Sequence, residues 1–564
     1  MSSTGESGVA SRRQLLWCAL ACALVGMVVF SPSLFGGYAI DDAFVVSPVD
    51  DAGNVRPLVG TLGSIGDYFS THWWYGYYPA DTLFRPVTKL SYGWTHVLFG
   101  ASSSHPAGAQ HAVNILVYGW VCALVAIALA RLSGSIRAAW IGGLTFAVHT
   151  LHAEAVATLT GRAELFAFGF GLQAVLVLGI LGRSERTSRA LAASCIGLVA
   201  TTFFFAAFCS KESAAAWVPL VFGLALWRGD RTQRILAISS VLVAFGLFWW
   251  LRARMIDGLP AEVPATNEFA NPLVALTASD RIAVAIRIVG FGLWKILFPI
   301  RLAVDHGHAV FSMAPGFGSP WTLVTIASYA LACAAAIRCA RRHPLFLVAL
   351  AVHACFVLPT SNLLFPIGTI FGERLLFAPS FALPIAVAGL VSWLERGKNL
   401  GLSLWIPLCM WLLHAGTYSF RRSIWFETTA TIAKHDVQVR PESANLQRLA
   451  SEAYLAEGDR GAAIEALENA CRIEPAFAAA WLNLAALVRA AGDEERAERV
   501  LREGLERAAV AQVRERAMLH ASLATGLAAR GEIDQAKQEL REAIELDPSD
   551  ARYRERLEAL ERGR

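Results

Sequence analysis

Charged side chains are scarce in this sequence. Only 17% of its 564 residues are Asp, Glu, Lys or Arg, whereas 55% are hydrophobic, and the mean hydropathy is +0.46. Soluble globular chains carry about 25% charged residues, so most of this chain must face something other than water. The formal net charge of +4 is small and no dense basic block occurs, so nothing predicts binding to nucleic acid.

Motifs that hold cofactors, metals or disulfides are also missing. The sequence has no Cys-x-x-Cys, no Walker phosphate loop and no His-Glu-x-x-His. Nine of its ten cysteines lie in or beside apolar runs, and only Cys471 belongs to the polar C-terminal part, which excludes a disulfide framework. Arg12 and Arg13 precede an apolar run, but no good cleavage site follows, so we expect an uncleaved first helix rather than a signal peptide.

Long apolar runs fill the chain up to about Arg421. A helix needs about 20 apolar residues to cross a hydrocarbon core of about 30 Å. Twelve runs meet or nearly meet this length: 14–31, 111–131, 136–151, 163–182, 189–209, 213–227, 234–251, 281–300, 320–338, 344–361, 374–394 and 400–418. The sequence therefore predicts an all-α, polytopic membrane helix bundle over residues 1–420.

The basic clusters between these runs predict their orientation, because Lys and Arg accumulate on the cytoplasmic side. The clusters are Arg12/Arg13, Arg131/Arg137, Arg183/Arg186/Arg189, Arg228/Arg231/Arg234, Arg338/Arg341/Arg342 and Arg396/Lys398. Twelve crossings would place the cluster at 338–342 outside. Run 281–300 contains Arg287 and Lys295, and treating it as re-entrant or interfacial restores agreement. We therefore expect about eleven crossings, a cytoplasmic N-terminus, a first external loop at 32–110 and an external C-terminal tail.

The tail repeats one pattern three times. After a linker at 421–441, residues 442–564 hold repeats at 444–475, 478–509 and 517–548, whose glycines Gly458, Gly492 and Gly531 are 34 and 39 residues apart. A period of 34 residues, with small residues where two helices cross, is typical of tetratricopeptide repeats. Such repeats form an α-solenoid with a concave groove that suits peptides.

Ionisable residues gather in the segments expected outside the membrane. Such residues beside membrane helices are costly and indicate function. Seven external segments carry them: Asp41-Asp42, Arg85, His149 to Glu154, Arg162 with Glu164, Lys211-Glu212, Asp305-His306 and Glu373-Arg374.

These residue types suit the transfer of a sugar from a lipid phosphate. Asp41 and Asp42 raise each other's proton affinity, and either could act as general base toward an alcohol. The predicted phosphate- and sugar-binding residues are Arg85, Arg162, Lys211 and Arg374 as cations, with His152, Glu154, Glu164, Glu212 and Glu373 beside them.

Each group also has a purely structural interpretation. The Asp pair could cap a loop helix, the histidines could bond backbone groups, and Lys211-Glu212 could be an ion pair at a helix end. For the aromatic run Trp73 to Tyr78 we favour an interfacial belt over a sugar-binding platform.

The order of these segments resembles the transmembrane and tetratricopeptide-repeat protein O-mannosyltransferases, membrane glycosyltransferases of the GT-C fold. The matching pieces are Asp41-Asp42, Leu83-Phe-Arg85-Pro86-Val-Thr88, His149-Thr-Leu-His152-Ala-Glu154-Ala, Gly161-Arg162-Ala-Glu164, Ser210-Lys211-Glu212, Glu373-Arg374-Leu-Leu-Phe-Ala-Pro379-Ser380 and the repeats. The likeness covers nearly the whole chain, and the segment from His149 to Glu164 is its most specific part.

The resemblance implies an inverting transfer of mannose or another hexose from a polyprenyl- or dolichyl-phosphate donor to a hydroxyl, as on Ser or Thr of a protein. An acid of the first external loop would stand at the reaction centre, which maps to Asp41 or Asp42. The Ala- and Arg-rich composition indicates a bacterial genome. In a bacterium the resemblance implies an undecaprenyl-like donor, a location in the cytoplasmic membrane and a periplasmic tail. The first loop has no Asp-x-Asp, so we expect neither a metal nor another cofactor.

Two other functions stay open. The chain could be a non-catalytic scaffold whose repeats gather envelope proteins, or a flippase or polymer ligase that shares the lipid phosphate but not the protein acceptor. Convergence of the Asp pair, Arg162 and Lys211 on one external cavity would favour the enzyme, and scatter over the outer face would favour the scaffold.

Overall fold

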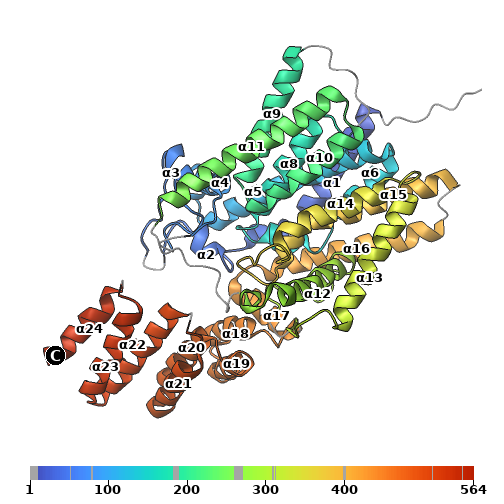
Figure 1. Cartoon of the computed structure of the whole chain (residues 1–564). Coiled ribbons are helices and arrows are strands. Elements are labelled where there is room, and N and C mark those ends of the chain that lie inside the picture. The colour runs from blue at the N-terminus through green and yellow to red at the C-terminus, as the bar shows by residue number, and fades with distance from the viewer. Residues whose placement is uncertain are drawn as a thin grey trace, which may run out of the picture.

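The computed structural model describes residues 11–50, 53–77, 81–181, 190–259, 271–307, 310–311, 313–397, 402–510, 512–548 and 550–563. These residues form helices and connecting loops, with a single isolated β-bridge between Val49 and Val55. The all-α prediction is confirmed. Figure 1 shows two parts, a bundle of long helices and a C-terminal stack of shorter ones.

Every predicted apolar run forms helix. The elements are α1 (Arg12–Val29), α5 (Pro106–Ser133), α6 (Ile136–Ala147), α8 (Arg162–Val177), α9 (Ala190–Phe208), α10 (Trp217–Arg228), α11 (Arg231–Asp257), α12 (Ala278–Leu297), α13 (Pro320–Cys339), α14 (Leu345–Val357), α15 (Ala382–Gly397) and α16 (Leu402–Trp425). Among the described residues, five helical segments are long and apolar enough to cross a membrane: Arg12–Val29, Pro106–Ser133, Arg231–Asp257, Pro320–Cys339 and Glu373–Glu395. The count of eleven crossings stays a prediction.

Basic residues expected on the cytoplasmic side meet at one end of the bundle. Arg228 donates to the carbonyl of Arg131 at 3.4 Å, and Arg137 lies 3.7 Å from Glu395 near the end of α15. These contacts join the ends of α5, α10 and α15 with the start of α6. The predicted cytoplasmic residues Arg183, Arg186, Arg189 and Lys398 lie outside the described residues.

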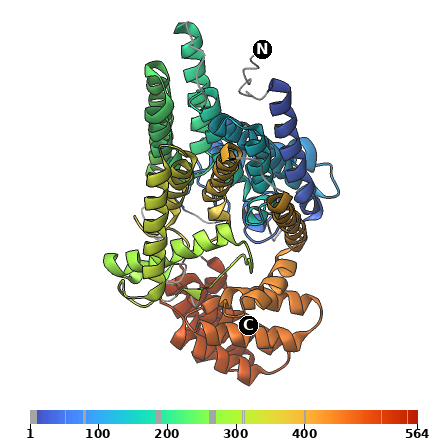
Figure 2. The same cartoon turned by 90° about the vertical axis from the view of Figure 1, so that its right-hand side faces the viewer.

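Helix α12 begins and ends at the opposite end of the bundle. Near its start, Arg281 donates to the carbonyl of Asn362 at 3.0 Å, and near its end Lys295 lies 3.9 Å from Glu373. Asn362 and Glu373 belong to the same connection between α14 and α15. Figure 2 shows α12 crosswise to the upright helices. This placement supports the expectation that run 281–300 lies along the interface.

The first external loop is a folded cap over that same end. It contains α2 (Asp42–Val45), α3 (Ile65–Phe69), α4 (Pro86–Thr95) and η2 (His96–Gly100). Pro86 occupies the first turn of α4, where its missing N–H would have no partner in any case. A small core of Val45, Val46, Val59, Trp73, Tyr92 and Leu159 ties the cap to the turn after α7 (His152–Ala157).

The tail forms three helix pairs and one last helix. They are α18 (Ala444–Ala456) with α19 (Arg460–Ile473), α20 (Ala478–Ala490) with α21 (Glu494–Arg507), α22 (Val513–Ala529) with α23 (Ile533–Leu546), and α24 (Ala551–Glu561). Gly458, Gly492 and Gly531 have φ of 81°, 90° and 83°, a left-handed conformation that glycine adopts without strain. Each glycine therefore ends the first helix of its pair.

The tail is attached to the end of the bundle that carries the cap. Within the predicted linker, α16 continues to Trp425 and α17 (Thr429–Val439) follows. Arg422 forms a buried ion pair with Asp436 of α17, and the second oxygen of Asp436 accepts the N–H of Val304 at 2.8 Å. The repeats therefore lie on the same side of the bundle as α2, the helix that follows Asp41 (Figure 1).

Candidate active site

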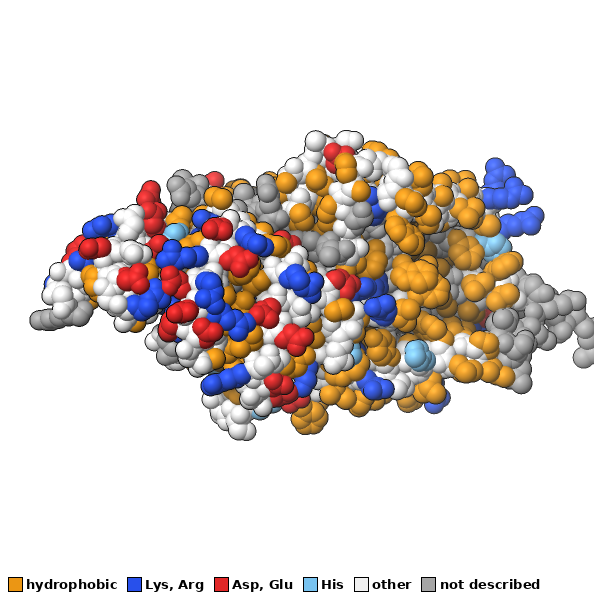
Figure 3. Space-filling model, turned by 90° about the horizontal axis from the view of Figure 1, so that it is seen from below, with side chains coloured by type: hydrophobic (Ala, Val, Ile, Leu, Met, Phe, Trp, Pro, Cys, Tyr) orange, Lys and Arg blue, Asp and Glu red, His pale blue; other side chains and the backbone are white. Residues whose placement is uncertain are grey.

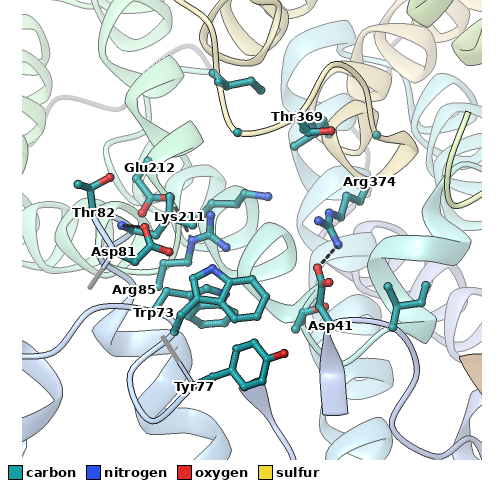
Figure 4. A pocket seen from close by; sticks show the side chains of 18 of the residues that line it. Asp41, Trp73, Tyr77, Asp81, Thr82, Arg85, Lys211, Glu212, Thr369 and Arg374 are labelled. Atoms are coloured by element: carbon teal, nitrogen blue, oxygen red, sulfur yellow. Dashed lines mark hydrogen bonds and ion pairs between the residues drawn. The ribbon is translucent and has the colours of Figure 1, made fainter. Parts of the chain in front are cut away.

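A cavity of about 2160 Å³ lies between the cap, the bundle and the tail. Seven of the eleven predicted site residues line it: Asp41, Arg85, Glu154, Glu164, Lys211, Glu212 and Arg374. Figure 4 shows Asp41 and Arg374 on one side of the cavity and Trp73, Arg85, Lys211 and Glu212 on the other. These residues come from segments that are far apart in the sequence.

One wall is built around Arg374. Its Nη1 donates to Asp41 Oδ2 at 3.1 Å, and its backbone N–H donates to Glu154 Oε2 at 2.8 Å. About 30% of the Asp41 side chain is exposed, and no described residue bonds its second oxygen. Burial raises the pKa of Glu154 to about 7, although Arg374 opposes the rise. Asp41 is thus the carboxylate of this wall that can reach an incoming hydroxyl.

The opposite wall holds two cations, each paired with an acid. Arg85 Nε donates to Glu212 Oε2 at 3.0 Å, and the other oxygen of Glu212 accepts the N–H of Phe84. Lys211 forms a buried ion pair with Glu164. Burial lowers the pKa of the Lys211 ammonium, and the Glu164 carboxylate counteracts that effect. These pairs place two cationic groups at the cavity surface, each balanced by a carboxylate.

Aromatic side chains cover the floor between the walls. Trp73, Trp74, Tyr75 and Tyr77 line the cavity, and Trp73 is only 3% exposed. The Arg85 guanidinium lies 5.0 Å from the centre of the Trp73 ring, a cation–π distance. Trp73 is buried, whereas Tyr75 and Tyr77 are 45% and 37% exposed, and the interfacial belt stays a prediction. Tyr78 lies outside the described residues.

The two neighbouring aspartates have different surroundings. Asp42 is completely buried, and its oxygens accept the backbone N–H groups of Leu159 at 2.9 Å and Thr160 at 2.8 Å. Burial raises the pKa of Asp42 to about 7 against the effect of these bonds. Asp42 is absent from the cavity lining and fixes the turn between α7 and α8. The predicted catalytic pair is therefore split into one cavity residue and one buried residue.

Three further predicted residues bond inside the protein and do not line the cavity. Arg162 is fully buried and donates to Asn114 and Gln110. His152 hydrogen bonds with Tyr118 and Ser380, both at 2.8 Å. Glu373 accepts from the N–H of Ala303 and lies 2.8 Å from His306 Nε2. Arg162 and His152 thus link helices from distant parts of the chain, and Glu373 links the connection before α15 to the loop that contains Ala303 and His306.

Several cavity residues were not predicted. Arg252 and Trp249 come from α11, Asp305 and Thr369 from external loops, and Arg514 and Arg552 from the repeats. Arg252 follows directly after the apolar run 234–251 and was not among the predicted site residues. Its position at the expected external end of that run was the sequence feature that could have identified it as a site residue. The tail residues carry no local signal, because only the packing of the tail brings them to the cavity.

No group of three or more His, Cys, Asp or Glu side chains among the described residues is arranged to hold a metal ion. The charged groups of the cavity instead suit an anionic, sugar-bearing ligand, since arginine binds phosphate oxygens and aromatic rings pack against sugar faces.

Comparison with known proteins finds similar sequences. Two models described as tetratricopeptide repeat match residues 454–523 and 527–550. The chain is 23% identical over 480 residues to Protein O-mannosyl-transferase TMTC3 of Mus musculus. The aligned region covers 80% of this chain and 50% of that protein. It is 24% identical over 420 residues to Protein O-mannosyl-transferase TMTC4 of Mus musculus, covering 64% and 54%. The chain is a relative of the protein O-mannosyl-transferases.

The predicted resemblance to these O-mannosyl-transferases is confirmed. The chain spans about half the length of the curated O-mannosyl-transferases it matches. A solved oligosaccharyltransferase of Archaeoglobus fulgidus aligns over 73% of this chain and 56% of its own, with a TM-score of 0.38 and 11% identity. The assignment to the GT-C fold stays a prediction from the sequence motifs.

Proposed function

We propose that this chain is a membrane glycosyltransferase that moves mannose or another hexose from a polyprenyl-phosphate donor to a Ser or Thr hydroxyl of a protein. One observation carries the proposal. A carboxylate with a free oxygen, Asp41, lies in the same cavity as the cations Arg85, Lys211 and Arg374, above an aromatic floor. That combination supplies a base and a positively charged surface for a phosphate leaving group.

In the proposed reaction, the acceptor hydroxyl oxygen attacks the anomeric carbon of the sugar from the side opposite the phosphate. The bond between the anomeric carbon and the phosphate oxygen breaks, and the configuration inverts. The hydroxyl proton passes to the free oxygen of Asp41, which lines the cavity. The leaving group departs as polyprenyl phosphate.

The cations have two roles in this scheme. Arg374 holds Asp41 in place through the 3.1 Å contact. Arg85 and Lys211 keep positive charge on the other wall, where negative charge accumulates on the phosphate in the transition state. Donors that are already oriented stabilise that charge without reorganising, and this accelerates the reaction in addition to binding the substrate.

The repeats fit a protein acceptor. Residues of α18, α22 and α24 line the same cavity as Asp41, so a peptide held in the repeat groove has a direct route to the base. We place the reaction at the external face of the membrane, in bacteria the periplasmic face of the cytoplasmic membrane, and propose that it needs no metal.

The test is mass spectrometry of envelope proteins from a strain without this chain, complemented with the wild type, with Asp41→Asn or with Asp67→Asn. Loss of a general base costs about 10²- to 10⁴-fold in rate, so Asp41→Asn should abolish the hexose-bearing peptides that the wild type restores. Asp67 lies in the same loop, is exposed and caps α3 outside the cavity, so Asp67→Asn should behave as the wild type.

Two other outcomes would decide against the proposal. Full hexosylation with Asp41→Asn refutes the role of Asp41 as the base. An unchanged set of hexose-bearing peptides in the strain without the chain favours the non-catalytic scaffold, whose repeats would collect envelope proteins.

A further inference from the structure

The cations of the cavity differ in how they are neutralised. Arg85, Lys211 and Arg374 each have a carboxylate partner, respectively Glu212, Glu164 and Asp41. Arg252 and Arg514 also line the cavity, and neither has an ion-pair partner among the described residues, but Arg514 is exposed whereas Arg252 is half-buried. Its Nε is buried and makes no hydrogen bond to any described group. A half-buried charge without a partner is costly unless an anion occupies the site in the working protein.

Arg252 stands at the end of an aromatic strip on α11. Phe245, Phe248, Trp249 and Arg252 all line the cavity, and their spacing of three, four and seven residues places them on one face of the helix. The Arg252 guanidinium lies 5.4 Å from the centre of the Trp249 ring. Phe248 packs 6.0 Å from Phe84, the neighbour of Arg85. The strip thus adjoins the cationic wall.

The strip follows the axis of α11, which we expect to cross the membrane. Phe245 and Trp249 belong to the apolar run 234–251, and Arg252 is the first residue beyond it. That level corresponds to the boundary between hydrocarbon and headgroups, where a lipid phosphate lies. A polyprenyl phosphate at this place would put its phosphate beside a cation and its chain beside aromatic rings.

We propose that Arg252 binds the phosphate of a polyprenyl monophosphate, and that Phe245 and Trp249 contact its first isoprene units. The inference deepens the proposed function and rests on it for the identity of the natural lipid. Arg85, Lys211 and Arg374 each bond a carboxylate, whereas Arg252 can provide charge-assisted hydrogen bonds that no resident carboxylate already occupies.

The experiment measures binding by the purified full-length protein in nanodiscs. The probes are farnesyl phosphate, farnesol and inorganic phosphate, and the variants are Arg252→Gln, Arg252→Lys and Arg254→Gln. Arg254 is the matched control, because it lies two residues further on α11, stacks on Trp250 at 5.3 Å and is absent from the cavity lining. Loss of a hydrogen bond to a charged group corresponds to about a tenfold or greater loss of affinity.

We expect Arg252→Gln to weaken farnesyl phosphate about tenfold or more and to leave farnesol unchanged. Arg252→Lys should retain part of the affinity, and Arg254→Gln should match the wild type. Equal affinity of the wild type and Arg252→Gln for farnesyl phosphate would overturn the proposal. Equal affinity of the wild type for inorganic phosphate and farnesyl phosphate would overturn the lipid part, because the aromatic strip would then contribute nothing.

The two experiments distinguish failure of the Arg252 phosphate site from failure of the proposed transferase function. Binding that ignores Arg252, together with hexosylation that requires Asp41, would remove only this inference. Binding that depends on Arg252 in a protein whose loss changes no hexosylated peptide would leave a lipid-phosphate site without the transferase. If Arg252→Gln lowers the thermal midpoint, the binding result is taken from Arg252→Lys. This variant keeps the positive charge and therefore tests the site in a folded protein.

Discussion

Asp41 and Asp42 show how neighbouring residues of one type receive different environments. Asp41 precedes the first turn of α2 and faces the cavity, whereas Asp42 begins the helix and points into the protein. A single step along a helix turns the side chain by about a quarter of a circle or more. The buried aspartate accepts two backbone N–H groups, and the exposed one is held by an arginine.

The raised pKa of Asp42 predicts a specific pH dependence of stability. The folded protein holds the Asp42 proton up to about pH 7, whereas the unfolded chain releases it near the usual value of 3.8. Between these values the folded state binds more protons, so the contribution of Asp42 to the free energy of unfolding falls as pH rises and is constant above about pH 7. The difference between the thermal midpoints of the wild type and Asp42→Asn should therefore become smaller as pH rises from about 4 to about 7.

Midpoints that change in parallel with pH in the two proteins would contradict the raised pKa of Asp42.

The sequence alone does not tell whether a polar side chain faces the cavity or the protein interior. The sequence predicted that Arg85, Lys211 and Arg374 share one site, and all three line the same cavity. It gave Arg162 the same role, because Arg162 occupies an equivalent position next to an apolar run. The partners that bury Arg162 are Gln110 and Asn114 on α5, about 50 residues away in the chain, and no local pattern reports them.

At the scale of helices, apolar length and basic flanks were sufficient. All twelve runs became helices, and even the crosswise α12 could be anticipated, since Arg287 and Lys295 interrupt its apolar character. The cap over residues 32–110 was not predicted, because its short helices have no long period. Its order comes from contacts with distant elements, such as the bond from Tyr92 to the carbonyl of Leu159.

The attachment of the tail depends on α17 and one buried ion pair. Arg422 and Asp436 are 1% and 0% exposed, whereas Lys434 and Glu457 form a pair on the surface of the same region at 40% and 55%. Breaking a buried pair costs about 3–5 kcal/mol, and an exposed pair contributes about 0–1 kcal/mol. Asp436→Asn should therefore detach α17 and expose the junction.

Limited proteolysis in nanodiscs checks this expectation. Asp436→Asn should be cut between α16 and α18 much faster than the wild type, and Glu457→Gln should be cut at the wild-type rate. Equal resistance of Asp436→Asn would show that the loop around Val304 and Asp305 secures the tail without the ion pair.

For the whole molecule, the main question is which side of the membrane each end of the bundle faces. The cavity joins the cap and the repeats, so both must lie on one side of the membrane, opposite the basic end near Arg137. Cysteines introduced at position 457 and at position 137 report the two sides, because both side chains are largely exposed. The exposed native residues Cys195 and Cys409 are replaced by Ala beforehand.

A membrane-impermeant maleimide added to sealed cells should label Glu457→Cys at once and Arg137→Cys only after permeabilisation. The opposite pattern would invert the topology, and labelling of both before permeabilisation would place the two ends on the same side. Either result contradicts the eleven-crossing arrangement.

The pair of Asp41 and Arg374 also has a consequence for synthesis. Its two members are separated by 333 positions in the chain. A ribosome therefore delivers the base to the membrane early, but the residue that holds it follows only after most helices have been inserted. An interrupted or shortened chain would contain the aspartate in a site with one wall missing. Under the proposed function, only molecules whose synthesis has passed Arg374 have both walls of the site and can transfer the sugar.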